Sequence, residues 1–156
     1  MKRFSQPGFT LVELIIVIAI GGLIVTLAFY GISQGQREKR DDARRSDASH
    51  YLLAAKQWAS ENNGILPANP AYAAAVVTTY ITAGSASFND PDGSPWVIKF
   101  ATAAMLPVTP DANPDMWVAS GATCDYGTPA GIAAGGARQF AVAVALEAGG
   151  SYCVSN

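Results

Sequence analysis

The sequence has few of the side chains that catalysis or metal binding requires. It contains one histidine, His50, and two cysteines, Cys124 and Cys153. No other Cys, His or Asp cluster surrounds His50, so we expect it on the surface or in packing contacts and predict no metal ligand there. The carboxylates form no recognisable motif with a nucleophile and a base. We therefore expect neither an enzyme nor a protein with a bound cofactor.

Charge is also scarce. Charged residues make up 14% of the 156 residues, and 10 basic against 12 acidic side chains leave a net charge of −2. Such a balance does not suggest a nucleic-acid surface, and no nucleic acid is predicted as a direct partner. The length fits one domain and one membrane segment. Because the C-terminal part is rich in Ala, Gly, Thr, Pro and Ser, we expect a small core.

Charge and proline are both missing from a long N-terminal stretch. No charged residue occurs between Leu14 and Gln36, and no proline occurs between Phe9 and Leu66. A helix of this length spans a hydrocarbon layer of ~30 Å. Residues 9–32 include fifteen Leu, Ile, Val and Phe, which favour insertion by about 5–9 kcal/mol. A charge at the bilayer centre costs roughly 2.5–3.5 kcal/mol. Glu13 lies near one end, so the segment inserts despite it.

The absence of cysteine before Cys124 excludes a lipoprotein anchor at this segment. A secretory signal would have a shorter apolar stretch followed by a small-residue cleavage site. Residues 26–28, Thr-Leu-Ala, are a passable site, but the stretch is long and Glu13 interrupts its start. A plain N-terminal anchor fits the length. It leaves Glu13 and the short basic leader, residues 1–8, unexplained.

The sequence Gly-Phe-Thr-Leu-Val-Glu at residues 8–13, preceded by the basic leader, resembles the processing site of type IV pilins and type II secretion pseudopilins. The resemblance implies that prepilin peptidase cleaves between Gly8 and Phe9, that the new Phe9 amine is N-methylated, and that the apolar segment is retained. It also implies a single-pass precursor in the cytoplasmic membrane with its head outside. A membrane assembly machinery then builds these subunits into an extracellular homopolymeric pilus.

This resemblance suggests a role for Glu13. Filament subunits stack these helices in a central bundle that holds little water, where an unpaired carboxylate costs several kcal/mol. The Phe9 amine of a neighbouring subunit would supply the opposite charge. We hypothesise that the pair sets the axial register, as buried polar groups do in coiled coils. The alternative is a glutamate that is merely tolerated at the membrane interface.

The charges that flank the apolar segment do not agree with this orientation. Lys2 and Arg3 precede it, whereas five basic residues follow within residues 37–45. Counting alone would place the C-terminus inside. The later charges alternate with acidic residues, however, and a long domain follows. Two cysteines beyond the segment also favour a disulfide in an oxidising compartment over two free thiols. We therefore place the head outside.

We expect the helix to continue to about Asn62, which divides the chain into a leader (1–8), a transmembrane or filament-core helix (9–36), an amphipathic helix (37–63) and a head (64–156). Residues 62–64, Asn-Asn-Gly, provide a stop signal. Apolar side chains at spacings of three and four define the face that packs under the head. These are Ala48, Tyr51, Leu52, Ala55, Trp58 and Ala59.

Charged residues at 37–45 predict a solvated stretch of this helix. The pairs Arg37–Asp41 and Asp41–Arg45 have i,i+4 spacing, which supports an exposed helix modestly. Contacts of this cluster with lipid headgroups or with neighbouring subunits are the functional alternative. Tyr51 and Trp58 are predicted to be core residues rather than binding residues.

The head is predicted to be α+β and pilin-like, with a small antiparallel sheet packed on the long helix. Asn69 and Pro70 begin a short helix that runs to about Ala83. Strands are predicted at residues 96–100, 116–119 and 139–146, the last in a hairpin with residues 152–154. Bulky residues alternate along 139–146 and should face the long helix.

A bond between Cys124 and Cys153 would close a loop of about thirty residues and contribute roughly 3–4 kcal/mol. It resembles the disulfide that bounds the variable C-terminal region of many pilins, and residues 125–137 would form a loop inside it that faces out of the filament.

Asp90, Asp92 and Ser94 place oxygens at alternate positions, as in a calcium loop, and some pseudopilins carry calcium in a related place. Gly93 is at the fourth position rather than the sixth, however, and no glutamate closes the frame at Ala101. A plain Asp/Pro/Gly turn is the favoured interpretation.

The sequence thus predicts a structural subunit of a type IV pilus. The alternatives are a type II secretion pseudopilin, a minor pilin of DNA uptake and, from another class, a membrane-anchored enzyme or binding module.

Overall fold

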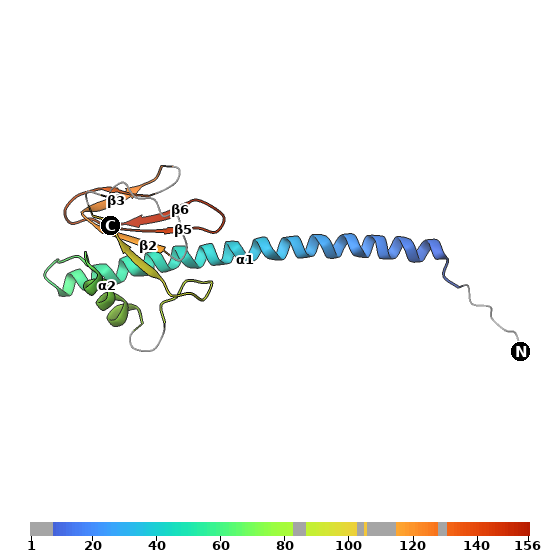
Figure 1. Cartoon of the computed structure of the whole chain (residues 1–156), viewed down its shortest axis with the longest axis horizontal. Helices are drawn as coiled ribbons and strands as arrows, with labels where there is room; N and C mark the ends of the chain where they lie inside the picture. The colour runs from blue at the N-terminus through green and yellow to red at the C-terminus, as the bar shows by residue number, and fades with distance from the viewer. Residues whose placement is uncertain (1–7, 83–86, 103–104, 106–114, 128–130) are drawn as a thin grey trace, which may run out of the picture. The chain divides into compact units, whose positions relative to one another are not determined.

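A computed structural model describes residues 8–82, 87–102, 105, 115–127 and 131–156, with the side chains of residues 30–33 excepted. The chain divides into two compact units, Met1–Gln36 and Arg37–Asn156. Figure 1 shows the order of the elements along the chain. Each unit is described separately below.

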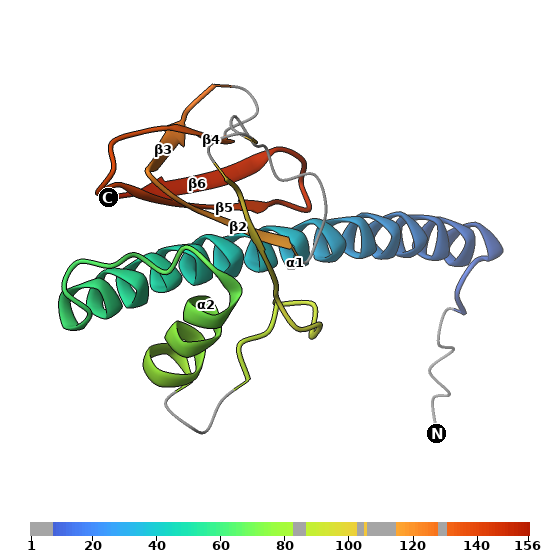
Figure 2. The same cartoon turned by 60° about the vertical axis from the view of Figure 1, so that its left-hand side comes forward.

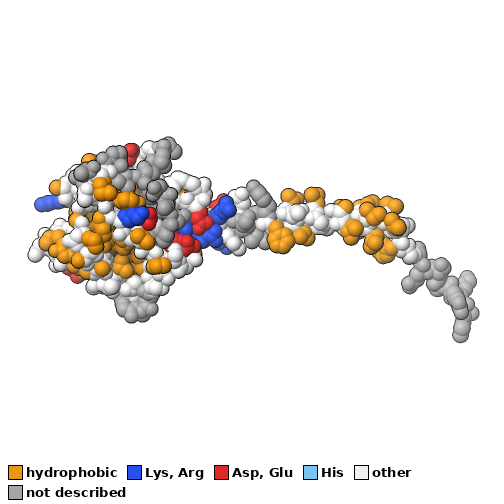
Figure 3. Space-filling model, viewed as in Figure 1, with side chains coloured by type: hydrophobic (Ala, Val, Ile, Leu, Met, Phe, Trp, Pro, Cys, Tyr) orange, Lys and Arg blue, Asp and Glu red, His pale blue; other side chains and the backbone are white. Residues whose placement is uncertain are grey.

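The predicted long helix is confirmed as α1, Leu11–Glu61. In the first unit its described side chains are all exposed, including Phe29 at 71%. Mean hydropathy reaches 2.7 over an 18-residue window, and none of that window is buried inside the protein. Orange apolar side chains accordingly cover the helix of this unit in Figure 3. By length and composition, α1 is able to cross a membrane.

The end of α1 follows the predicted stop signal. Asn63 and Gly64 take left-handed conformations, with φ of 55° and 79°, and the Gly64 N–H donates to the Ala59 carbonyl at 2.7 Å. Such a cap satisfies carbonyl groups that the helix would otherwise leave without partners. The chain then reverses through Pro67, which is buried.

The short helix is shorter than predicted and changes type. Helix α2 covers Pro70–Val76, and the Asn69 side chain accepts a hydrogen bond from the Tyr72 N–H at 2.9 Å, as expected of an N-cap. A π-helical turn, η1 (Val77–Ile81), follows. There the Thr82 N–H donates five residues back to the Val77 carbonyl at 2.9 Å. Threonine hydroxyls that bond to helix carbonyls loosen the regular ladder. Ala83 lies outside the described residues.

The main sheet has the strand order β1-β2-β5-β6. Strands β2 (Asp115–Ser120), β5 (Phe140–Ala145) and β6 (Ser151–Ser155) pair antiparallel, as predicted. Strand β1 (Val97–Phe100) instead pairs parallel to β2, so the sheet is mixed. Sequence patterns of single strands do not encode the direction of pairing, which the connecting chain decides.

The core of the second unit lies between the sheet and the α1 residues after Arg37. Tyr51, Leu52 and Ala55 pack against Val142 and Phe140, with Tyr51 and Phe140 stacked at a centroid distance of 6.4 Å. The larger side chains of β5 therefore face α1, as the alternation predicted. Figures 1 and 2 show the sheet and α2 on different sides of this part of α1. Each buried Val or Phe contributes roughly 1.5–3 kcal/mol.

A second sheet was not predicted. Strands β3 (Ala122–Asp125) and β4 (Gly131–Ala134) form an antiparallel hairpin where we expected a loop at 125–137. The expectation of a loop is wrong for β4, while residues 128–130 lie outside the described part. The hairpin packs on Ala141 and Ala143, the small residues on the other face of β5. The predicted disulfide is present between Cys124 of β3 and Cys153 of β6.

Candidate assembly site

Thr10 and Glu13 form a local hydrogen-bonded box at the start of α1. One carboxylate oxygen of Glu13 accepts from the Thr10 N–H at 3.1 Å and from the Thr10 hydroxyl at 2.9 Å. In return, the Glu13 N–H donates to the Thr10 hydroxyl at 3.3 Å. This is a capping box, in which two side chains satisfy backbone donors that the first turn leaves free. Our sequence reasoning missed it, although the Thr-x-x-Glu spacing that signals it was present.

The surroundings of Glu13 are open. Its side chain is exposed, and so is Phe9 at 89%. Gly8, Phe9, Thr10 and Glu13 line a cavity of about 330 Å³. A carboxylate on an otherwise apolar, exposed helix therefore has a local role in capping and remains accessible from outside.

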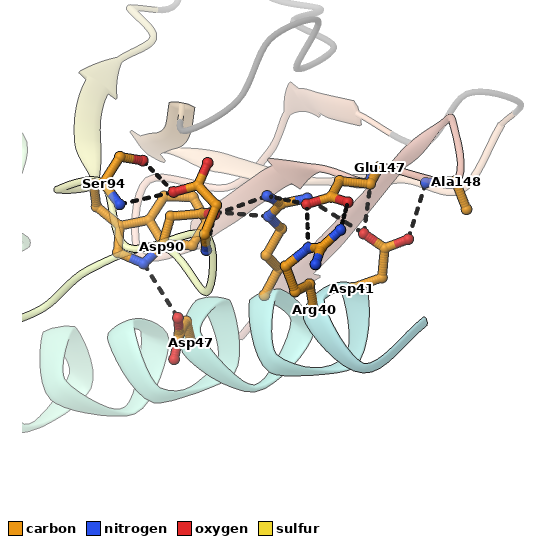
Figure 4. Close-up of polar contacts among 10 residues, drawn as sticks. Arg40, Asp41, Asp47, Asp90, Ser94, Glu147 and Ala148 are labelled. Atoms are coloured by element: carbon orange, nitrogen blue, oxygen red, sulfur yellow. Dashed lines mark hydrogen bonds and ion pairs between the residues drawn. The ribbon is translucent and has the colours of Figure 1, made fainter. Parts of the chain in front are cut away.

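A second cluster of charge lies in the other unit, around the α1 residues that were predicted to be solvated. Arg44 is fully buried and holds Asp90 with two parallel hydrogen bonds of 2.7 Å. The same guanidinium contacts Glu147 at 2.9 Å. Arg40 binds both oxygens of Glu147, at 2.8 and 2.7 Å. Figure 4 shows this network between α1 and two loops of the head.

Asp41 is part of the same network and binds the turn between β5 and β6. Its two carboxylate oxygens accept from the Glu147 N–H at 2.7 Å and from the Ala148 N–H at 3.0 Å. Only 2% of the Asp41 residue is exposed. The prediction of a solvated stretch is thus wrong for Asp41 and Arg44, because the β5–β6 turn and the Asp90 turn cover them. Arg45, the predicted i,i+4 partner of Asp41, pairs with exposed Asp42 instead.

The network shifts the pKa values of its members in the directions expected of ion pairs. Hydrogen bonds from Arg40 hold the pKa of Glu147 below its ordinary value. Asp90, through its hydrogen bonds, raises the pKa of Arg44. Next to the network, Asp47 accepts from the Trp96 ring N–H at 3.2 Å, and burial raises the pKa of Asp47. The head therefore favours the charged forms of Arg44 and Glu147.

The three residues of the possible calcium loop are engaged in protein contacts. Asp90 gives both carboxylate oxygens to Arg44. Asp92 accepts from the Ser94 N–H at 2.8 Å, and Gly93 has a φ of 96°. Together these contacts describe an Asp/Gly turn docked on α1. Within the described residues, no group of three or more His, Cys, Asp or Glu side chains is arranged to hold a metal ion.

Comparison with known proteins finds a match for the N-terminal part of the chain. Residues 3–29 match the family model described as the prokaryotic N-terminal methylation motif. This motif is typical of type IV pilins and of type II secretion pseudopilins, which are structural proteins and not enzymes. It implies processing by prepilin peptidase and assembly into a filament. The comparisons with curated proteins and with solved structures find no match.

Proposed function

We propose that this type IV pilin-like chain is a structural subunit of a type IV pilus, made as a membrane precursor. Prepilin peptidase cuts between Gly8 and Phe9, the new amine is methylated, and α1 joins the filament core. Leader (1–8), core helix (9–36), amphipathic helix (37–63) and head (64–156) are the functional segments. The observation that carries the proposal is the methylation motif at 3–29, which includes the exposed, apolar start of α1 and its one carboxylate, Glu13.

Glu13 carries the assembly step. In the filament core the carboxylate loses its water, and the capping hydrogen bonds from Thr10 do not neutralise its charge. The methylated amine of Phe9 on a neighbouring subunit supplies a positive charge. A charge that is buried without its partner destabilises a structure by about 3–5 kcal/mol. An axial offset that separates Glu13 from the neighbouring amine is therefore disfavoured, and the pair selects one offset between subunits.

The capping box makes a sharp test possible. Glu13→Gln preserves the box, since Glu and Gln serve equally at this position, but it removes the charge. Thr10→Ala keeps the charge and removes the cap. We expect both variants to insert and to be cut before Phe9, as shown by the mass of the mature protein. Glu13→Gln should reduce filaments counted by electron microscopy at least tenfold, whereas Thr10→Ala should retain most of them.

Filaments at wild-type levels from Glu13→Gln would refute the charge pairing. A mature protein that starts at Met1 or after Ala28 would refute the filament subunit itself. The related filaments, a secretion pseudopilus or a pilus with this chain as a minor pilin, use the same motif. Deleting the chain and imaging the cells separates them, because loss of a major pilin removes the pili altogether.

A further inference from the structure

Two cavities of opposite charge lie along one side of the head. The first, of about 470 Å³, is lined by Lys56 and Arg138 together with Ala59, Asn63, Gly64, Leu66 and Asn156. The second, of about 300 Å³, is lined by Glu38, Asp41, Asp42, Arg45 and Ala148. We name them the basic and the acidic pocket. Their side chains carry formal charges of +2 and −2.

The helix geometry places the pockets on the same side. Glu38 and Lys56 are eighteen residues apart on α1, which is five full turns at 3.6 residues per turn and ~27 Å along the axis. Each pocket also includes a residue from one end of β5. Arg138, which precedes this strand, lines the basic pocket, and Ala148, which follows it, lines the acidic pocket. One side of the head thus has the basic pocket near the end of α1 and the acidic pocket five turns earlier.

The charges that matter are available for an outside partner. Lys56, Arg138 and Glu38 are exposed and form no ion pair within the part of the chain that the structure describes. Asp42 is exposed as well, and among the described residues it forms an ion pair with Arg45, itself exposed. Among the neighbouring basic residues of α1, Arg40 and Arg44 are engaged with Glu147 and Asp90, whereas Arg37 and Lys39 are exposed.

We propose that the occupant of each pocket is a second copy of this chain: the basic pocket of one head binds the acidic pocket of a head displaced by about 27 Å. In the proposed filament all subunits point in the same direction, which excludes a two-fold pairing of these pockets, so the contact is heterologous and its repetition builds an open helical array. This inference rests on the proposed filament function and adds to it a contact between heads. Parallel heads with no offset would place like charges opposite each other, so the two pockets disfavour that arrangement.

A charge exchange tests the contact. Lys56→Glu with Arg138→Glu makes the basic pocket acidic, and Glu38→Lys with Asp42→Lys makes the acidic pocket basic. We expect each double variant to reduce filaments at least tenfold. Combining all four substitutions in one chain should restore filaments to within about twofold of wild type, because the complementarity returns with its direction reversed.

Co-expression gives an independent test. Each double variant repels itself but complements the other at both ends, so a mixture should form filaments in which the two alternate. The control is Asp92→Lys with Asp125→Lys, which changes the net charge by the same amount as the acidic-pocket variant, at two other exposed carboxylates, and should assemble normally. All variants should keep the wild-type melting temperature and the mature mass that starts at Phe9.

Normal assembly of either pocket variant overturns the proposal. So does failure of both the four-substitution chain and the mixture, provided that these proteins fold and are processed. Absence of filaments from the wild-type chain with its assembly machinery would instead refute the proposed function, and this outcome is distinguishable because it needs no substitution.

Discussion

Arg44 is a buried side chain that connects α1 to the loops of the head. It bridges α1 to two segments distant in sequence, through Asp90 and Glu147. Both the guanidinium and the Asp90 carboxylate are almost completely removed from water, with 1% and 0% of their side chains exposed. Burial of a pair is weak evidence for a net gain in stability, but loss of one member leaves the other charge unpaired. The network therefore positions the two loops.

Arg44→Met is expected to destabilise the protein by about 3–5 kcal/mol, because Asp90 stays buried without its partner. Urea unfolding followed by circular dichroism measures the change. Arg45→Met is the matched control, since Arg45 and Asp42 form an exposed pair, and such pairs contribute at most about 1 kcal/mol. Equal effects of the two substitutions would show that the network does not hold the loops.

Among the elements, the β3–β4 hairpin depends most on tertiary contacts. Its strands have four residues each, β4 consists largely of Ala and Gly, and the hairpin packs on a face of small residues. Gly135 follows β4 where a side chain has no room, because an added Cβ would lie 2.8 Å from the Ala122 carbonyl carbon. The Cys124–Cys153 bond joins this hairpin to β6. The hairpin is therefore held on the main sheet by the disulfide and by close packing of small side chains, without a large apolar interface.

Replacing Cys124 and Cys153 by serine should cost roughly 3–4 kcal/mol in the chain-entropy model, for a sequence separation of 29 residues. We expect the loss to be uneven. In hydrogen exchange, the amides of β3 and β4 should lose protection first, while those of β5 keep theirs, because β5 is paired on both edges. Uniform loss of protection would mean that the hairpin and the main sheet unfold as one unit.

At the scale of the whole molecule, the chain combines two units with different requirements. Residues of α1 before Gln36 expose apolar side chains and bury none of the described ones. The second unit closes its own core between α1, α2 and the sheet, and it contains the disulfide. A membrane or a bundle of neighbouring helices has to cover the first unit, since water solvates such a surface poorly.

A fragment of residues 37–156 should therefore fold without the first unit. We expect it to be monomeric without detergent, to unfold in one cooperative transition, and to melt within a few degrees of the full-length protein in detergent. Size-exclusion chromatography and calorimetry measure both properties. A fragment that aggregates or lacks a cooperative transition under oxidising conditions would show that the second unit needs the apolar helix to fold.

Sequence patterns alone determined the local and periodic features of this protein. Apolar length and the Asn-Asn-Gly stop predicted α1, alternation predicted β5 and the face that it turns to the helix, and the residues around Gly8, Phe9 and Glu13 indicated the methylation motif. These features depend on neighbours within a few residues or on a fixed period. The capping box of Thr10 was equally local and was available to the same reasoning.

Tertiary structure alone decided which surfaces meet. The burial of Asp41 and Arg44, the parallel pairing of β1 and the docking of the β3–β4 hairpin on β5 all depend on partners distant in sequence. A run of alternating charges has the same pattern whether water or a loop covers it, and pairing direction leaves no periodic trace in a strand. The two pockets also depend on tertiary structure, because the packing of β5 beside α1 brings Arg138 near Lys56.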